Sequence, residues 1–136
     1  MKIKRFLRIL FLLLICIVIV EFIAGPHIYN TVNEAMITKQ GYSAKIRALM
    51  SKEEFDSINV YNSYQISKED NSNVELKLYP IAMIHNFKDG YVWMNYSITI
   101  TDKSGEIIAG SWDIPIKITL KKVDGIWYLT NIYEPA

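Results

Sequence analysis

The chain has 136 residues, 51% of them hydrophobic and 21% charged, and its net charge is +1. This length suits one modest domain and excludes a multidomain enzyme. One cysteine and two histidines exclude a disulfide framework, a cysteine-based zinc site and a histidine-rich metal centre, so we expect no metal and no cofactor. Residues 1–25 are net +3, which leaves residues 26–136 at net −2 without a basic surface for nucleic acid.

The first 25 residues have the pattern of a membrane segment. Ile9 to Val20 is an unbroken apolar run that follows four positive charges, of which Arg5 and Arg8 lie closest to it. Residues 6–24 span a bilayer if Arg8 extends its guanidinium to the headgroups. We therefore expect residues 1–25 to form a basic cytoplasmic tail and a transmembrane signal anchor. By the positive-inside rule, residues 26–136 are then one extracytoplasmic domain.

Two other interpretations of this segment stay open. A cleaved signal peptide would release a secreted form, although a cut after Ala24 places the large Phe22 where a small residue is needed. Lipoprotein processing at Cys16 needs a small residue before the cysteine, and Ile15 stands there. The expectation is an uncleaved single-pass anchor in the cell membrane, with Cys16 as an apolar residue of the span and the lipid bilayer as its partner.

The next part of the chain has a helical pattern. Pro26 suits the first turn of a helix, and apolar residues then recur every three or four positions over residues 27–50. Gly41 weakens this helix, so the segment is either one bent helix or two helices that meet near Gly41. A capping box follows, in which Ser51 and Glu54 satisfy each other's free backbone amides and start a short second helix.

From about residue 74 the apolar residues alternate with polar ones, which predicts strands. Turn signals separate these strands: Lys88-Asp89-Gly90, Asp102-Lys103-Ser104-Gly105 and Asp124-Gly125, the last typical of a type I′ hairpin. The apolar parity changes at Pro80, which predicts a bulge or a bend, and Gly110 is the expected bend of a long strand from Glu106 to Leu120. The predicted fold class is α+β, with a transmembrane helix followed by one or two helices packed on a curved four-stranded antiparallel sheet.

The closing segment adds a resemblance. From Ile114 to Tyr133 the chain combines an amphipathic strand, an Asp-Gly turn and a last strand that contains Trp-Tyr. This pattern resembles the final hairpin of nuclear-transport-factor-2-like (cystatin-like) extracytoplasmic domains, of the kind seen in small bacterial envelope proteins, and the likeness covers Tyr91 to Tyr133. The resemblance implies a sheet curved around a helix. It names no activity, because that fold hosts enzymes, binding modules and scaffolds alike.

Aromatic residues are the main candidates for a binding site. Five of those in the sheet half are taken as partner-binding candidates: Tyr91, Trp93, Trp112, Trp127 and Tyr133. Strand parity predicts that Trp127 and Tyr133 share one side of the last strand. The alternative interpretation is that these rings plug the open end of a small curved sheet.

Catalytic candidates are few. His85 with Asp113 or Asp89 is a conceivable base with an orienting carboxylate, but no nucleophile accompanies it, and we expect no catalytic residue and no enzyme. The expected function is a membrane-anchored binding or scaffold module that mediates protein–protein contacts in the cell envelope, with a homo-oligomer as one arrangement. A cystatin-like inhibitor or immunity protein and a small-ligand or enzymatic pocket protein are the alternatives.

Overall fold

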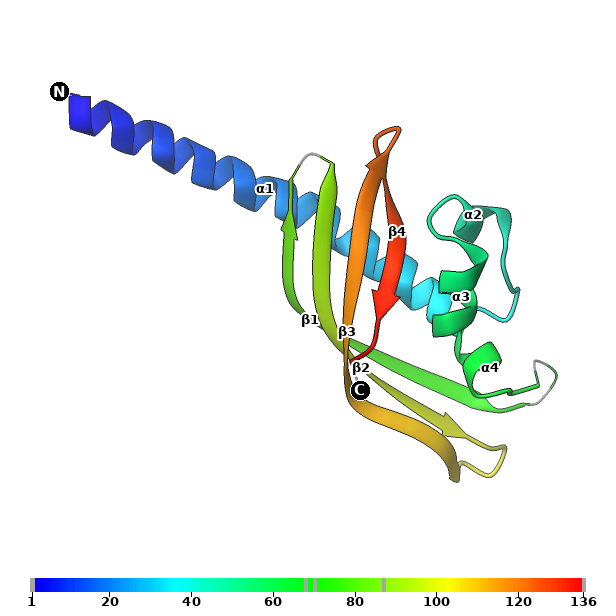
Figure 1. Ribbon diagram of the computed structural model, residues 1–136. Coiled ribbons are helices and arrows are strands. Elements are labelled where there is room, and N and C mark those ends of the chain that lie inside the picture. Colours follow the sequence, from blue (N-terminus) through cyan, green and yellow to red (C-terminus); the bar gives the residue numbers. More distant parts are fainter. Residues whose placement is uncertain (1, 68, 70, 87, 136) are drawn as a thin grey trace.

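A computed structural model describes residues 2–67, 69, 71–86 and 88–135, and for residues 20–24 and 26 we describe the backbone only. The described chain is α+β, with helices first and strands after them (Figure 1). The helices are α1 (Lys2–Ile37), α2 (Ala44–Arg47), α3 (Lys52–Ile58) and α4 (Val60–Ser63), and the strands are β1 (Asn73–His85), β2 (Asp89–Thr101), β3 (Ile107–Val123) and β4 (Ile126–Tyr133).

The strands form one antiparallel sheet in the order β1-β2-β3-β4, so each strand pairs with its neighbour in sequence as predicted. The turn between β3 and β4 has positive φ at both central residues, 49° at Asp124 and 79° at Gly125. That is the backbone of a type I′ turn, whose twist matches the twist of the strands that it joins. The sequence prediction of a meander closed by this hairpin is confirmed.

Register shifts interrupt the pairing of β1 and β3 with the central strand β2. In β1 the register shifts between Pro80 and Ala82, which confirms the predicted bulge. In β3 the expected bend at Gly110 is wrong, because Gly110 lies in a regular ladder opposite Thr99. The pairing is interrupted on both sides of it: Ile108 is an extra residue before Gly110, and another is inserted opposite β2 after it, where Asp113 has a φ of 56°. Figure 1 shows the strands turning sharply at this level.

A further bulge changes which side chains of β4 face the core. The register of β3 and β4 shifts at Leu120, so Thr130 is the extra residue. Trp127 and Leu129 before the bulge are buried, and Ile132 after it also packs against the core. The predicted grouping of Trp127 with Tyr133 is therefore wrong, because the inserted residue turns Tyr133 to the opposite face.

The helix that begins the domain starts much earlier than predicted. α1 continues without a break through Pro26, although proline supplies no backbone N–H and removes one hydrogen bond from the helix interior. Its last turns bury Ile28, Val32 and Met36 against the sheet. α1 ends at residue 37, Gly41 takes a φ of 75°, and α2 follows, so the interpretation as two helices is confirmed.

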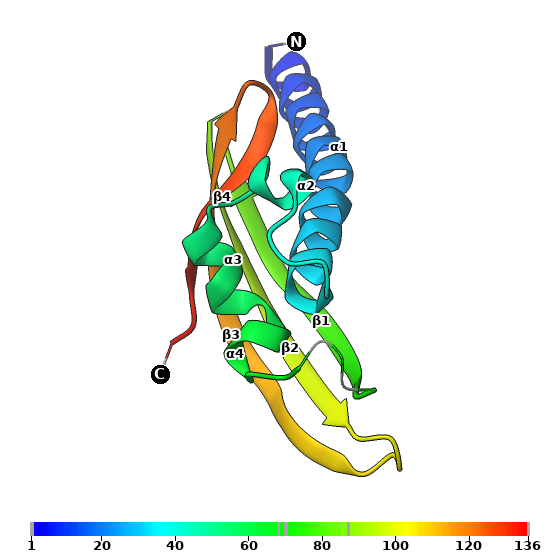
Figure 2. The same ribbon diagram turned by 90° about the vertical axis from the view of Figure 1, so that its right-hand side faces the viewer.

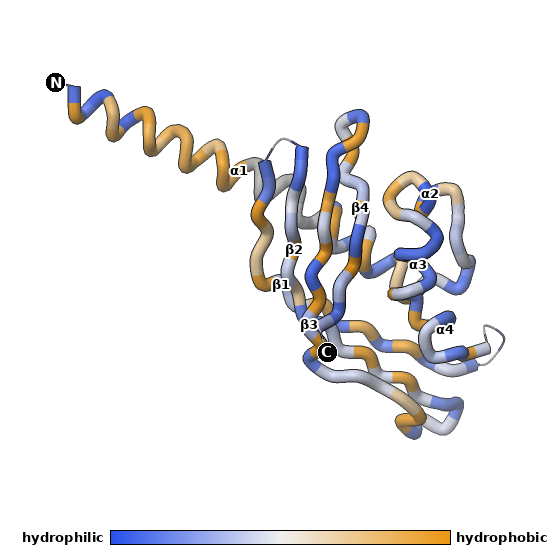
Figure 3. Tube along the Cα trace, viewed as in Figure 1, coloured by the Kyte–Doolittle hydropathy of each residue, from blue (hydrophilic) through white to orange (hydrophobic). Residues whose placement is uncertain are grey.

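All four described helices lie on one side of the sheet (Figure 2). The amino-terminal half of α1 projects beyond the sheet (Figure 1), and after a hydrophilic start it is mostly hydrophobic (Figure 3). Every side chain of residues 2–19 is exposed, including those of Arg5, Arg8, Ile9 and Cys16. Within the residues that the structure describes, no helix is both long enough and apolar enough to cross a membrane.

The capping box is half formed. The Ser51 hydroxyl accepts a hydrogen bond from the Glu54 amide (3.2 Å), as predicted, and begins α3. The Glu54 carboxylate does not return to Ser51 and instead accepts a hydrogen bond from the backbone N–H of Ile132 in β4 (3.0 Å). Beside it, the Leu129 amide donates to the carbonyl of Leu49 (2.8 Å). Two contacts from the helical layer thus cover the free edge of β4.

Candidate functional site

The outer face of the sheet, opposite the helices, carries three of the five aromatic candidates. Trp93 of β2 pairs with Lys117 of β3, and Lys117 pairs with Tyr133 of β4, so these residues form one cross-strand row. Tyr91 lies two residues before Trp93 and shares its face. Tyr91 and Tyr133 are 42% and 56% exposed, far more than an aromatic residue in a core. We call Tyr91, Trp93, Lys117 and Tyr133 the aromatic row.

Lys117 is the one charged member of the aromatic row. Its ammonium lies 4.6 Å from the ring centre of Tyr91 and 5.5 Å from that of Trp93, which are cation–π distances. The two rings are themselves in contact, with centres 6.0 Å apart. None of the ion pairs among the described residues involves Lys117. The row therefore combines exposed rings with a cation that has no carboxylate partner in this part of the chain.

The other two candidates lie elsewhere. Trp112 is 59% exposed, and its ring covers Gly110, where an added Cβ would come within 2.9 Å of it. Trp112 lies next to Asp113 in the bulge of β3 and does not belong to the cross-strand row. Trp127 is only 8% exposed, and its ring packs edge-on against His85 in the core at 5.5 Å. A ring buried in this way offers no surface to a partner, so Trp127 is not part of the outer face.

The structure separates His85 from Asp113. His85 pairs with Gly90, and Asp113 donates its backbone N–H to the Ser97 hydroxyl on the same strand β2 (2.9 Å). Gly90 and Ser97 are seven residues apart along β2, which corresponds to roughly 23 Å of strand. Asp89 pairs with Lys121 on the outer face, whereas His85 points toward Trp127 in the core. Neither carboxylate orients the imidazole as a general base requires.

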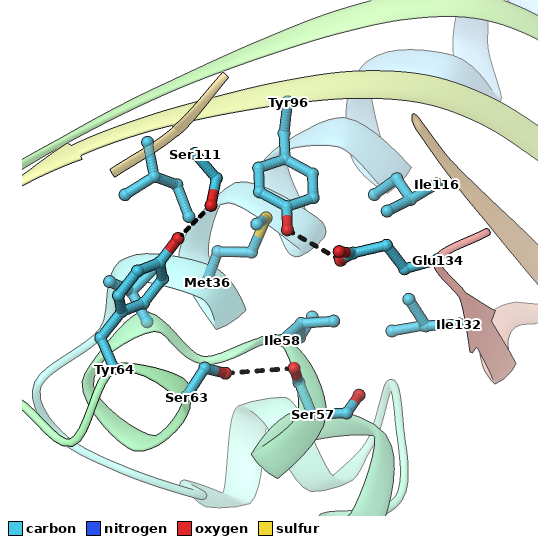
Figure 4. Close-up of a pocket in the computed structure, with 12 residues that line it drawn as sticks. Met36, Ser57, Ile58, Ser63, Tyr64, Tyr96, Ser111, Ile116, Ile132 and Glu134 are labelled. Atoms are coloured by element: carbon cyan, nitrogen blue, oxygen red, sulfur yellow. Dashed lines mark hydrogen bonds between the residues drawn. The ribbon is translucent and has the colours of Figure 1, made fainter. Parts of the chain in front are cut away.

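The structure also contains a pocket that the sequence analysis did not identify. It lies between the helices and the concave face of the sheet and has a volume of about 290 Å³. Figure 4 shows its lining: Met36, Ser57, Ile58, Val60, Ser63, Tyr64, Tyr96, Ile98, Ser111, Ile116, Ile132 and Glu134. The buried residues are mostly apolar, while Ser57, Ser63 and Glu134 are exposed and form the mouth.

Two hydrogen-bonded pairs occupy the polar side of the pocket. The Tyr96 hydroxyl donates to the Glu134 carboxylate (2.8 Å), and the hydroxyls of Tyr64 and Ser111 share a hydrogen bond of 2.5 Å (Figure 4). Burial, together with the hydrogen bond to Glu134, raises the pKa of Tyr96, so its phenol stays protonated at neutral pH and remains a donor. The arrangement offers hydroxyl groups and one carboxylate beside an apolar wall.

The sequence held one signal for this pocket. Tyr96 is the only residue with a polar side-chain atom among the inward-facing positions of β2, which it shares with Gly90, Val92, Met94, Ile98 and Ile100. Its partner Glu134 lies two residues from the end of the chain, and no local pattern links the two. Only the folded sheet brings the chain end across to β2, and this is why sequence reasoning missed the site.

In the described part of the chain, no group of three or more His, Cys, Asp and Glu side chains is placed to hold a metal ion. The two candidate sites are therefore the aromatic row on the outer face and the pocket on the inner one. Neither a protein-family model nor a curated protein matches this chain.

Proposed function

We propose that the protein is a membrane-anchored extracytoplasmic binding module whose aromatic row contacts a protein partner in the cell envelope. The observation that carries the proposal is the position of Lys117, a cation without an ion-pair partner among the described residues, which lies against the rings of Tyr91 and Trp93 on a sheet face that no described helix covers. A partner that suits this face brings a carboxylate to Lys117 and apolar side chains to Tyr91 and Tyr133.

The anchor is supported by the exposure of α1. Its amino-terminal half carries an exposed apolar run from Ile9 to Ile19, and such a surface is unstable in water. The sequence adds Val20 and the apolar residues 22–24 beyond this run. Residues 6–24 then make about 28 Å of helix, close to the roughly 30 Å hydrocarbon core of a bilayer. The four basic residues before the run keep the amino terminus in the cytoplasm.

A continuous helix makes the anchor part of the domain. The helix that leaves the bilayer is the same helix that buries Ile28, Val32 and Met36 in the core. The domain is thereby held close to the membrane surface, at an orientation that α1 sets. The helices on one face of a curved sheet also suit the nuclear-transport-factor-2-like fold that the closing hairpin resembles, and this family assignment is part of the proposal.

Photo-crosslinking in native membranes tests the partner. A photoreactive phenylalanine analogue replaces Tyr133 or Tyr91 in the full-length protein, and a matched control replaces the exposed Lys103 in the turn between β2 and β3. We expect both outer-face positions, and not position 103, to capture the same envelope protein. Lys117→Glu reverses the charge of the row and should abolish that capture, whereas Lys103→Glu should leave it unchanged.

Each other result overturns a part of the proposal. Capture of this chain alone would make the outer face a homo-oligomer contact, and capture of a soluble protein in a tight complex would favour the inhibitor or immunity alternative. Capture that survives Lys117→Glu would remove the role of the cation. Extraction of the protein from membranes by alkaline carbonate would contradict the anchor independently of any partner.

A further inference from the structure

The pocket has a charge that its own residues do not balance. Among the described residues that line the pocket, Glu134 is the only charged one, and it takes part in no ion pair with them or with the other described residues. One of its oxygens, Oε2, accepts the hydrogen bond from Tyr96. Oε1 has no hydrogen bond within the described residues, and this carboxylate stands at the mouth, where a ligand enters.

The remainder of the lining favours an apolar body. Ile58, Ile116 and Ile132 face the cavity beside Glu134, and deeper in the pocket Ile98 is only 2% exposed. The volume of about 290 Å³ is near the lower end of the range for ligand pockets, so it suits a small molecule. Apolar walls with a few convergent polar groups are typical of such sites.

We propose that this pocket binds a small organic ammonium ion, with the cation at Glu134 and the hydrocarbon body between Ile58, Ile116 and Ile132. A charge-assisted hydrogen bond from the ammonium to the carboxylate gives the site its preference for a cation over a neutral or anionic ligand of the same shape. This site is independent of the aromatic row, which lies on the other face of the sheet.

The test uses the full-length protein in phosphatidylcholine nanodiscs, with its isoleucine δ1 methyl groups labelled with ¹³C for NMR. The probes are cyclohexylammonium, cyclohexanol and cyclohexanecarboxylate, which share one body and differ in charge. Cyclohexylammonium should shift the methyl signals of Ile58, Ile116 and Ile132 but not that of the exposed Ile107. For so small a probe we expect a Kd of roughly 1–10 mM, and about ten-fold tighter binding than cyclohexanol.

Two variants separate the charge from the fold. Glu134→Gln keeps an acceptor for the Tyr96 hydroxyl and should weaken cyclohexylammonium about ten-fold while leaving cyclohexanol unchanged. Glu106→Gln, an exposed carboxylate in the turn before β3, is the matched control and should change neither. Ser57→Lys places an ammonium at the mouth, on an exposed residue that can change without disturbing the core, and should abolish binding of the cation.

The proposal is overturned if cyclohexanecarboxylate binds as tightly as cyclohexylammonium, if Glu134→Gln leaves the cation affinity unchanged, or if the pocket methyl signals do not move. The methyl signal of the buried Ile118, which is outside the pocket, reports whether each variant is folded. Because the readout is a set of methyl shifts in the pocket, its result does not depend on the membrane anchor or on a protein partner.

Discussion

Replacing Asn59 should destabilise the protein more than any exposed polar substitution. Asn59 is 1% exposed, and its amide nitrogen donates to the carbonyl oxygens of Ala35 (2.8 Å) and Thr38 (3.1 Å) at the end of α1. Its carbonyl oxygen accepts from the Asn62 amide (3.3 Å) and caps α4. The last carbonyls of a helix have no partner within it, so this one side chain joins the end of α1 to α4.

Three hydrogen bonds at about 1 kcal/mol each, with buried carbonyls left unpaired, give an expected loss of roughly 2–4 kcal/mol for Asn59→Ala. Domains of this kind have total stabilities of about 5–15 kcal/mol, so the loss is easily measured. Asn59→Asp keeps the cap on α4 but turns a carboxylate toward two carbonyl oxygens, and it should cost at least as much as alanine at neutral pH. That cost should shrink in acid, where the protonated carboxyl regains one donor.

The assay is urea unfolding of the full-length protein in nanodiscs, followed by the fluorescence of the tryptophans, one of which, Trp127, is buried. Asn71→Ala, at an exposed position without a described hydrogen bond, is the control and should lie within about 0.5 kcal/mol of wild type. If Asn59→Ala also stays within that margin, or if Asn59→Asp matches wild type at pH 7, the assignment of Asn59 as the link between α1 and α4 is refuted.

Three further predictions are read from the same unfolding assay. Gly110→Ala should lower the free energy of unfolding by about 1–3 kcal/mol, because its Cβ would lie 2.7 Å from the Ile98 carbonyl oxygen. Adding Trp112→Ala should not restore the stability, since the clash with the backbone persists. Full restoration would contradict the geometry. Asp113→Val should lower the free energy of unfolding by roughly 1–2 kcal/mol, because a β-branched residue does not tolerate a φ of 56°. Asp113→Asn can keep that φ and the hydrogen bond from Asn95, so it should be nearly neutral. Equal stabilities of the Val and Asn variants would refute the bulge. Burial raises the pKa of Glu54, so its ionised form is disfavoured in the folded state. Glu54→Gln keeps an acceptor for the Ile132 amide, so it should be at least as stable as wild type above the folded pKa of Glu54 and should lose that advantage in acid. Glu54→Ala should lower the free energy of unfolding by about 1–2 kcal/mol. A Gln variant that is less stable than wild type at neutral pH would refute this account.

Much of the fold follows from local sequence. Alternation of apolar residues fixed the strands of the sheet because side chains of a strand point to opposite faces in turn. The Asp124-Gly125 turn and the parity change at Pro80 are also local features, and both predictions are confirmed. Ser51 marks the start of α3 for the same reason, since a helix N-cap needs a side-chain oxygen at that one position.

Other features were decided only by tertiary structure. The bulge at Leu120 turns Tyr133 outward and Ile132 inward, and strand parity does not reveal where an extra residue is inserted. The Glu54 carboxylate bonds to the Ile132 amide of β4 and not to Ser51, because β4 brings this free backbone amide within its reach.

The candidate sites divide in the same way. Composition identified Tyr91 and Trp93 as aromatic candidates in the sheet half, but only the pairing of three strands places Lys117 between them and Tyr133. The pocket depends wholly on tertiary structure, because Tyr96 and Glu134 are far apart in sequence and meet only when the sheet curves. A sequence encodes which faces of its strands are apolar, whereas the contacts between distant segments are set when those faces pack together.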